Sequence, residues 1–129
     1  MYRISMFLKY VLMADAVTCF GTGLLLMFGS STLQEFLGLP AGLLRYAGAS
    51  LVPFAVWLVY LSTRDTFSRQ MIAAVIVLNL LWTLDSILLL FTGWVAPTEL
   101  GYGFVVAQAL GVALFAGLQY FGLRKSVAV

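Results

Sequence analysis

The stretch Met71–Gly93, MIAAVIVLNLLWTLDSILLLFTG, decides the fold of this chain. A helix needs about 20 apolar residues to cross the roughly 30 Å hydrocarbon core of a bilayer, so the stretch predicts a membrane-spanning helix. Its one ionisable side chain is that of Asp85. An acid near the middle of a span costs about 2.5–3.5 kcal/mol on insertion. We therefore expect Asp85 to have a functional role or a structural partner.

The polar residues of this stretch gather on one half of the predicted helix. With about 100° of rotation per residue, the other half is almost entirely aliphatic. We expect the polar half to face protein or water and the aliphatic half to face lipid, because exposed polar groups are costly in hydrocarbon. The polar half contains Asn79, Trp82, Thr83, Asp85, Ser86 and Thr92.

The composition is that of an integral membrane protein. Of the 129 residues, 63% are hydrophobic and 9% are charged, and the mean hydropathy is +1.05. A soluble domain would have about 25% charged residues. The net charge of +2 is too small to indicate a nucleic-acid partner. One Cys and no His exclude an intrachain disulfide and a His-based metal or haem site, and we expect no cofactor.

Three further apolar stretches, at about 7–29, 41–62 and 101–123, accompany residues 71–93. The chain is therefore predicted to be all-α, a four-transmembrane-helix bundle forming one domain over residues 1–129. The first stretch is too long for the apolar part of a signal peptide and no A-x-A site follows it, so we expect it to be retained.

A polar stripe marks the first predicted span. It contains Asp15, Thr18, Cys19 and Thr22, which lie at positions i, i+3, i+4 and i+7 and so share one helix face.

The loop over residues 30–42 contains helix signals of its own. Thr32 and Glu35 have the spacing of a capping box. Gly38 is suited to stop a helix and Pro40 to start the next one. We expect a short interfacial helix here, lying on the membrane surface or over the mouth of the bundle.

The basic residues are distributed unequally between the two predicted sides. Four spans place both termini and the turn at 63–70 on one side, and Arg45 is the basic residue of the other. Positively charged loops stay in the cytoplasm, so we expect a multi-pass protein of the cell (inner) membrane with both termini cytoplasmic. The basic residues of the predicted cytoplasmic side are Arg3, Lys9, Arg64, Arg69, Arg124 and Lys125.

Two short motifs recur along the chain. Asp15–Gly23 and Asp85–Gly93 share the spacing D-x6-T-G, while Tyr60–Arg64 and Tyr120–Arg124 share Y-x3-R. One interpretation is a duplication of two spans related by an axis along the membrane normal. The other is that Tyr and Arg are ordinary anchors at the inner ends of helices.

Asp85 and Asp15 are the main candidate functional residues. Asp85 is a candidate proton, cation or ligand site, or else a structural acid paired with Gln108 or Arg45. Asp15 lies at the depth of Asn79, and its alternative role is a hydrogen bond to a neighbouring helix. Intramembrane acids are functional candidates by default because they are costly to retain. Arg45 could instead meet a lipid head group or simply extend to the interface.

Other residues indicate helix contacts rather than chemistry. Gln108 and Gln119 are expected to be interhelical hydrogen-bond partners. Gly103, Ala107 and Gly111 form a ladder of small residues suited to close helix packing. Besides the lipid bilayer, the expected partner is therefore a second copy of the chain or a larger membrane complex that packs on this ladder.

In length and number of spans the chain resembles the small four-helix inner-membrane proteins of bacteria, DoxX-like proteins included. The segments LGLPAGLLRYAG (Leu37–Gly48) and VLNLLW (Val77–Trp82) are similar to that group. The resemblance covers the whole chain at the level of architecture. Small multidrug transporters are similar in size but have Glu in the first span, where this chain has Asp15.

Three functions are compatible with these residues. The first is a non-catalytic accessory, assembly or lipid-contacting subunit, which the short loops and the absence of a catalytic constellation favour. The second is an oligomeric transporter or a proton or cation pathway that uses Asp15 and Asp85. The third is a pocket between the spans for a hydrophobic ligand. An enzyme is the least expected, because the two acids lie at different depths on different helices.

Overall fold

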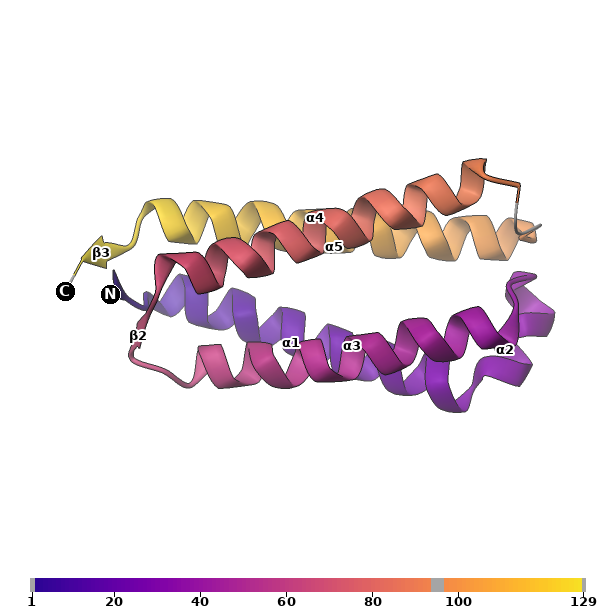
Figure 1. Ribbon diagram of the computed structural model, residues 1–129, viewed down its shortest axis with the longest axis horizontal. Coiled ribbons are helices and arrows are strands. Elements are labelled where there is room, and N and C mark those ends of the chain that lie inside the picture. Colours follow the sequence, from indigo (N-terminus) through magenta and orange to yellow (C-terminus); the bar gives the residue numbers. More distant parts are fainter. Residues whose placement is uncertain (1, 94–96, 129) are drawn as a thin grey trace.

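The computed structural model describes residues 2–93 and 97–128, and within them the chain is mostly helical (Figure 1). Four of its helices are long and apolar enough to cross a membrane, which confirms the predicted set of four. Three two-residue strands accompany the helices. The elements are β1 (Tyr2–Arg3), α1 (Met6–Phe28), α2 (Ser30–Leu37), α3 (Ala41–Ser62), β2 (Thr66–Phe67), α4 (Arg69–Phe91), α5 (Glu99–Arg124) and β3 (Val127–Ala128).

Two of the long helices, α1 and α5, start where a polar side chain caps them. At α1 the Ser5 hydroxyl oxygen accepts a hydrogen bond of 3.1 Å from the backbone N–H of Leu8. At α5 the Thr98 hydroxyl oxygen accepts one of 3.1 Å from the N–H of Gly101. Such caps satisfy donors that a helix leaves unpaired in its first turn.

The four long helices form two pairs, α1 with α3 and α4 with α5, as Figure 1 shows. Within the first pair, the backbones approach closely at Gly23 and Gly48. A β-carbon at Gly48 would lie 2.5 Å from the carbonyl oxygen of Gly23, so only glycine fits there. Small residues permit such close helix crossings in membranes. The two pairs meet mainly where α1 contacts α5.

The loop between α1 and α3 contains a short helix, α2, of eight residues. Gly38 ends it in the left-handed conformation, with φ of 69°, as the sequence predicts. The predicted capping box is wrong. The helix begins at Ser30, directly after Gly29, so Thr32 already lies inside the first turn and no side chain caps the start.

A small antiparallel sheet, with the order β2-β1-β3, closes the opposite end of the molecule. We did not expect it, because strands of two residues are too short to show an alternating pattern. The ring of Tyr2 stacks on that of Phe67, with 5.9 Å between centroids, and Phe67 is buried. Both termini lie at this "sheet end", and α2 marks the other, or "α2 end" (Figure 1).

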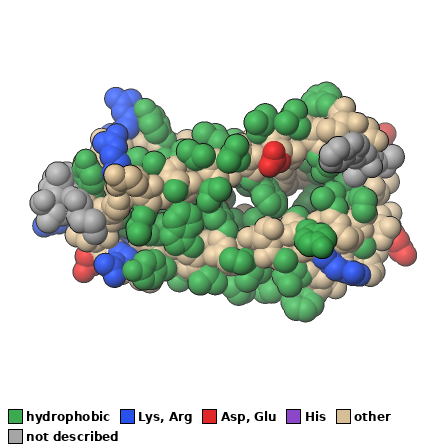
Figure 2. Space-filling model, in the orientation of Figure 1, with side chains coloured by type: hydrophobic (Ala, Val, Ile, Leu, Met, Phe, Trp, Pro, Cys, Tyr) green, Lys and Arg blue, Asp and Glu red, His purple; other side chains and the backbone are tan. Residues whose placement is uncertain are grey.

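Large apolar side chains cover the outside of the helices (Figure 2). Phe28, Tyr46 and Phe91 are each about four-fifths exposed, at 82%, 79% and 81%. A soluble protein does not usually present such a continuous apolar surface to water. Together with the four apolar helices, this surface indicates a membrane protein.

Candidate functional site

Four buried side chains form a polar cluster between the two helix pairs, here called the Asp15 cluster: Asp15, Cys19, Asn79 and Gln119. The Oδ2 atom of Asp15 accepts hydrogen bonds from Asn79 Nδ2 at 3.0 Å and from Gln119 Nε2 at 2.7 Å. The Oδ1 atom accepts from Cys19 Sγ at 3.3 Å. Asn79 Nδ2 also donates to Gln119 Oε1 at 2.9 Å. The Asp15 side chain is only 1% exposed.

The cluster connects α1, α4 and α5, and therefore joins one helix pair to the other. The carboxyl oxygens of Asp15 are the acceptors in all three of its hydrogen bonds. Among the described residues, no buried side-chain nitrogen or oxygen lacks a partner. A fully satisfied polar network inside a bundle specifies how its helices fit together.

The sequence explains part of this geometry. Asp15 and Cys19 are four residues apart, which places them on one face of α1. The structure brings Asp15 and Asn79 together at the common depth that the sequence indicates. Gln119 carries only a general signal of an interhelical contact, and nothing in the sequence assigns it to Asp15.

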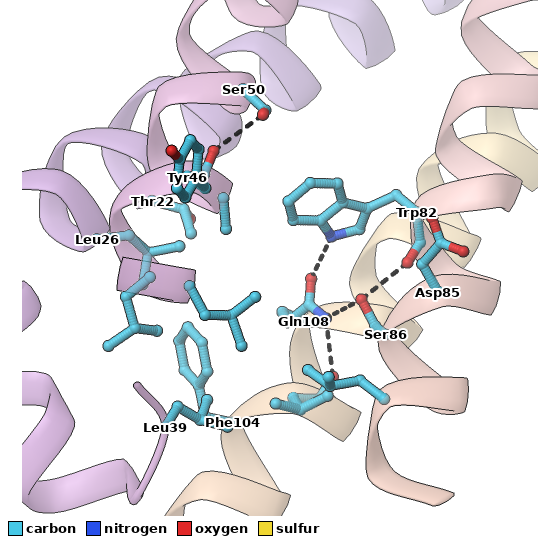
Figure 3. Close-up of a pocket in the computed structure, with 15 residues that line it drawn as sticks. Thr22, Leu26, Leu39, Tyr46, Ser50, Trp82, Asp85, Ser86, Phe104 and Gln108 are labelled. Atoms are coloured by element: carbon cyan, nitrogen blue, oxygen red, sulfur yellow. Dashed lines mark hydrogen bonds between the residues drawn. The ribbon is translucent and has the colours of Figure 1, made fainter. Parts of the chain in front are cut away.

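A second polar group lies toward the α2 end and stays within the α4–α5 pair. The indole Nε1 of Trp82 donates to Gln108 Oε1 at 2.7 Å. Gln108 Nε2 donates to Ser86 Oγ at 2.8 Å, and the Ser86 hydroxyl donates to the carbonyl oxygen of Trp82 at 2.8 Å (Figure 3). The bond to Gln108 holds the indole ring by its Nε1 edge.

Asp85 belongs to neither polar group. It is exposed, and within the described ranges it forms no hydrogen bond or ion pair. Gln108 is engaged with Trp82 and Ser86 instead. Arg45 donates from Nε to the Ser30 hydroxyl oxygen at 3.1 Å, which holds α3 to α2. The two structural partners considered for Asp85 are thus both occupied elsewhere.

A cavity of about 320 Å³ separates the two helix pairs in the half toward α2, and we call it the interpair cavity. Figure 2 shows the molecule hollowed between the pairs in this half. All four long helices contribute to its wall, which is mostly apolar (Figure 3). The described residues that line it are Thr22, Leu26, Leu39, Leu43, Leu44, Tyr46, Ala47, Ser50, Trp82, Asp85, Ser86, Leu89, Phe104, Val105 and Gln108.

Two neighbouring hollows adjoin the interpair cavity and share Trp82 with it. One, of about 430 Å³, lies between α3 and α4 beside Pro53 and Trp57. The other, of about 180 Å³, reaches Asp15 and Thr18. The Asp15 cluster therefore borders the same system of hollows that Asp85 lines.

The small-residue ladder on α5 is not used for close packing within the described chain. A β-carbon at Gly103 or at Gly111 would meet nothing within 4 Å, and Ala107 is exposed. The close approach of α5 is made instead at Gly101, against the backbone of Leu37. The ladder remains free for another helix, and a partner there stays a prediction.

The two Y-x3-R motifs make the same contact at the sheet end. The guanidinium of Arg64 lies 5.5 Å from the centre of the Tyr60 ring, and that of Arg124 lies 5.9 Å from the Tyr120 ring. Such cation–π contacts are modest at exposed positions. They suit interfacial anchors as well as a duplication.

Comparisons with known proteins identify no relative: no family model, no curated protein and no solved structure matches the chain. The similarity to DoxX-like proteins therefore rests on architecture alone, in the form of four helices that could each cross a membrane.

Proposed function

We propose that this chain is a non-catalytic membrane protein that binds a lipid-like hydrophobic molecule in the interpair cavity. The observation that carries the proposal is the cavity itself, which opens between two helix pairs and has a mostly apolar wall. Its volume of about 320 Å³ lies at the lower end of the range typical of small-molecule sites. Few polar groups among many apolar ones is the usual composition of such sites.

The distribution of polar contacts between the two helix pairs supports a binding site in the half of the bundle toward α2. The Asp15 cluster holds the two pairs together near the middle of the bundle, while no corresponding cluster joins them at the level of Trp82 among the described residues. A chain of this kind would serve as an accessory or lipid-contacting subunit, with the free ladder on α5 available for a partner helix.

We further propose that the sheet end faces the cytoplasm of a bacterial cell membrane. Support comes from the basic residues, which gather at the sheet end except for Arg45. Fusion of a reporter that is active only outside the cytoplasm, at residue 3 and at Glu35 in turn, would test this orientation. We expect activity only for the fusion at Glu35.

The cavity can be tested with a pair of neighbouring alanines on α3. Ala47 lines the cavity, whereas Ala49 is exposed and does not line it. We expect decanol to bind the purified protein in nanodiscs, with a change in tryptophan fluorescence because Trp82 lies in the wall. Ala47→Phe should abolish the binding by filling the cavity, and Ala49→Phe should leave it unchanged, and neither variant adds a tryptophan to the fluorescence signal. Equal binding by both variants would contradict the proposal.

A proton or cation pathway is the second candidate function. The observation that favours it is the hollow that reaches Asp15 and shares Thr22 and Gln108 with the interpair cavity. Proton uptake by liposomes containing the protein, driven by a potassium diffusion potential, would reveal it. Uptake that disappears in Asp15→Asn would favour this function over a binding site.

A further inference from the structure

We propose that the ligand of the interpair cavity is an amphiphile with a positively charged, amine-type head group, and that Asp85 is its counter-charge. This inference rests on the proposed function and specifies the chemical class of the ligand. It follows from the sign of the charge in the cavity wall, from the lack of a partner for Asp85 among the described residues, and from the aromatic rings that line the same cavity.

Asp85 is an unpaired acid inside a helix that is long and apolar enough to cross a membrane. It lines the cavity, and no described residue gives it a hydrogen bond or an ion pair. The contrast with Asp15 is direct, since three donors surround that carboxylate. An acid retained in a membrane segment is usually paired, and none of the described residues that line the cavity with Asp85 carries the opposite charge.

The other residues of the cavity wall indicate the sign of the charge on the ligand's head group. No Lys or Arg is found among the described residues that line the cavity. Arg45, at the same end, is directed to Ser30 on α2. A phosphate or carboxylate head group would meet the Asp85 charge without compensation, whereas an ammonium group would be attracted to it.

Aromatic rings in the same wall add to the attraction for a cation. Trp82, Tyr46 and Phe104 all line the cavity (Figure 3). The hydrogen bond from Trp82 Nε1 to Gln108 holds the indole in place through its edge, and this bond leaves the faces of the ring uncommitted. A cation near the face of an indole is stabilised by the quadrupole of the ring. The leucines of the wall would cover the hydrocarbon tail.

The test compares three probes that differ only in head group: decylamine, decanol and decanoate. Binding to the wild-type protein is measured in nanodiscs of zwitterionic lipid, and the signal of empty nanodiscs is subtracted. We expect decylamine to bind roughly tenfold more tightly than decanol, the ratio for a charge-assisted hydrogen bond near the lower end of its range. Decanoate should bind more weakly than decanol.

Asp85→Asn should reduce the affinity for decylamine to that for decanol and leave decanol binding unchanged, which also shows that the variant is folded. Glu35→Gln is the matched control, because Glu35 is an exposed acid of α2 that does not line the cavity. It should leave all three affinities unchanged.

Two kinds of result would overturn the inference, and they differ in whether the proposed function also fails. If the wild-type protein binds all three probes equally, or if Asp85→Asn keeps the preference for decylamine, the assignment of Asp85 is wrong while the cavity site stands. If none of the probes binds, the proposed function fails together with the inference.

Discussion

Asp15 and Asp85 begin the same D-x6-T-G motif, yet the structure places them in opposite surroundings. Asp15 is buried and accepts three hydrogen bonds from three residues. Asp85 is exposed and lines an open cavity. The polar residue of α4 that reaches the level of Asp15 is Asn79, not Asp85. Matching motifs therefore do not occupy matching levels in the bundle.

The difference teaches that an intramembrane acid can have two distinct effects. Where donors from several helices converge, as at Asp15, the acid joins the helices and the core closes around it. Where the neighbouring polar groups bond among themselves, as Trp82, Gln108 and Ser86 do, the acid remains available. In this chain the first arrangement holds the helix pairs together, and the second lies beside the cavity that separates them.

The largest difference is expected between the two acids when each is replaced by its amide. Asp15→Asn should lower the free energy of unfolding by about 2–3 kcal/mol, because hydrogen bonds to a charged group are lost and an amide donor is placed among donors. Asp85→Asn should change it by less than about 0.5 kcal/mol, as for most exposed sites. Reversible unfolding in mixed micelles measures both. If both variants lost a similar free energy of unfolding, Asp15 and Asp85 would not differ in their contribution to stability.

A smaller effect is expected from the amide partners of the two polar groups. Asn79→Leu should cost about 1.5 kcal/mol, because the buried Asp15 carboxylate loses one of its donors. Gln108→Leu should cost less, because it leaves no buried charge behind and an average interhelical hydrogen bond in a membrane contributes only about 0.6 kcal/mol. The same unfolding measurement applies. If the Gln108 variant were the less stable one, the Asp15 cluster would not be the more stabilising of the two polar groups.

The free energy of unfolding can be compared after a single methyl group is added at one of two glycines. One lies in the close contact between α1 and α3, and the other lies on the open surface of α5. Gly48→Ala should cost at least about 1 kcal/mol, because the new β-carbon would lie 2.5 Å from the Gly23 carbonyl oxygen and the two backbones would have to move apart. Gly117→Ala is the control, since a β-carbon there meets nothing within 4 Å. It should be neutral or slightly stabilising, because alanine is the better helix former. A tolerated Gly48→Ala would argue against close contact of α1 and α3.

The smallest effect is expected on chemical labelling, which compares how easily a thiol reagent reaches position 19 and position 50. Cys19 is the single cysteine of the chain and is only 6% exposed, inside the Asp15 cluster. A small maleimide should leave it unmodified in the folded protein. The variant that combines Cys19→Ala with Ser50→Cys should react, because Ser50 is exposed and lines the interpair cavity. Equal labelling would mean that the cluster and the cavity are equally open.

The amino-acid sequence by itself determined the four apolar helices, the unequal distribution of basic residues and the common depth of Asp15 and Asn79. These follow from properties local to each helix, namely its hydropathy, its length and the spacing of its polar residues. Each end of the four long helices lies within two residues of the end of the corresponding predicted apolar stretch.

Only the tertiary structure decided which acid is enclosed and which faces the cavity. That outcome depends on how each helix is rotated about its axis and which helix it pairs with, and both depend on contacts between distant segments. The close approach of Gly23 to Gly48 sets one pair. The bond from Gln119 to Asp15 joins residues 104 positions apart in the chain. No periodicity within a single span contains that information, so the same D-x6-T-G motif leads to a helix contact in one half and to a cavity wall in the other.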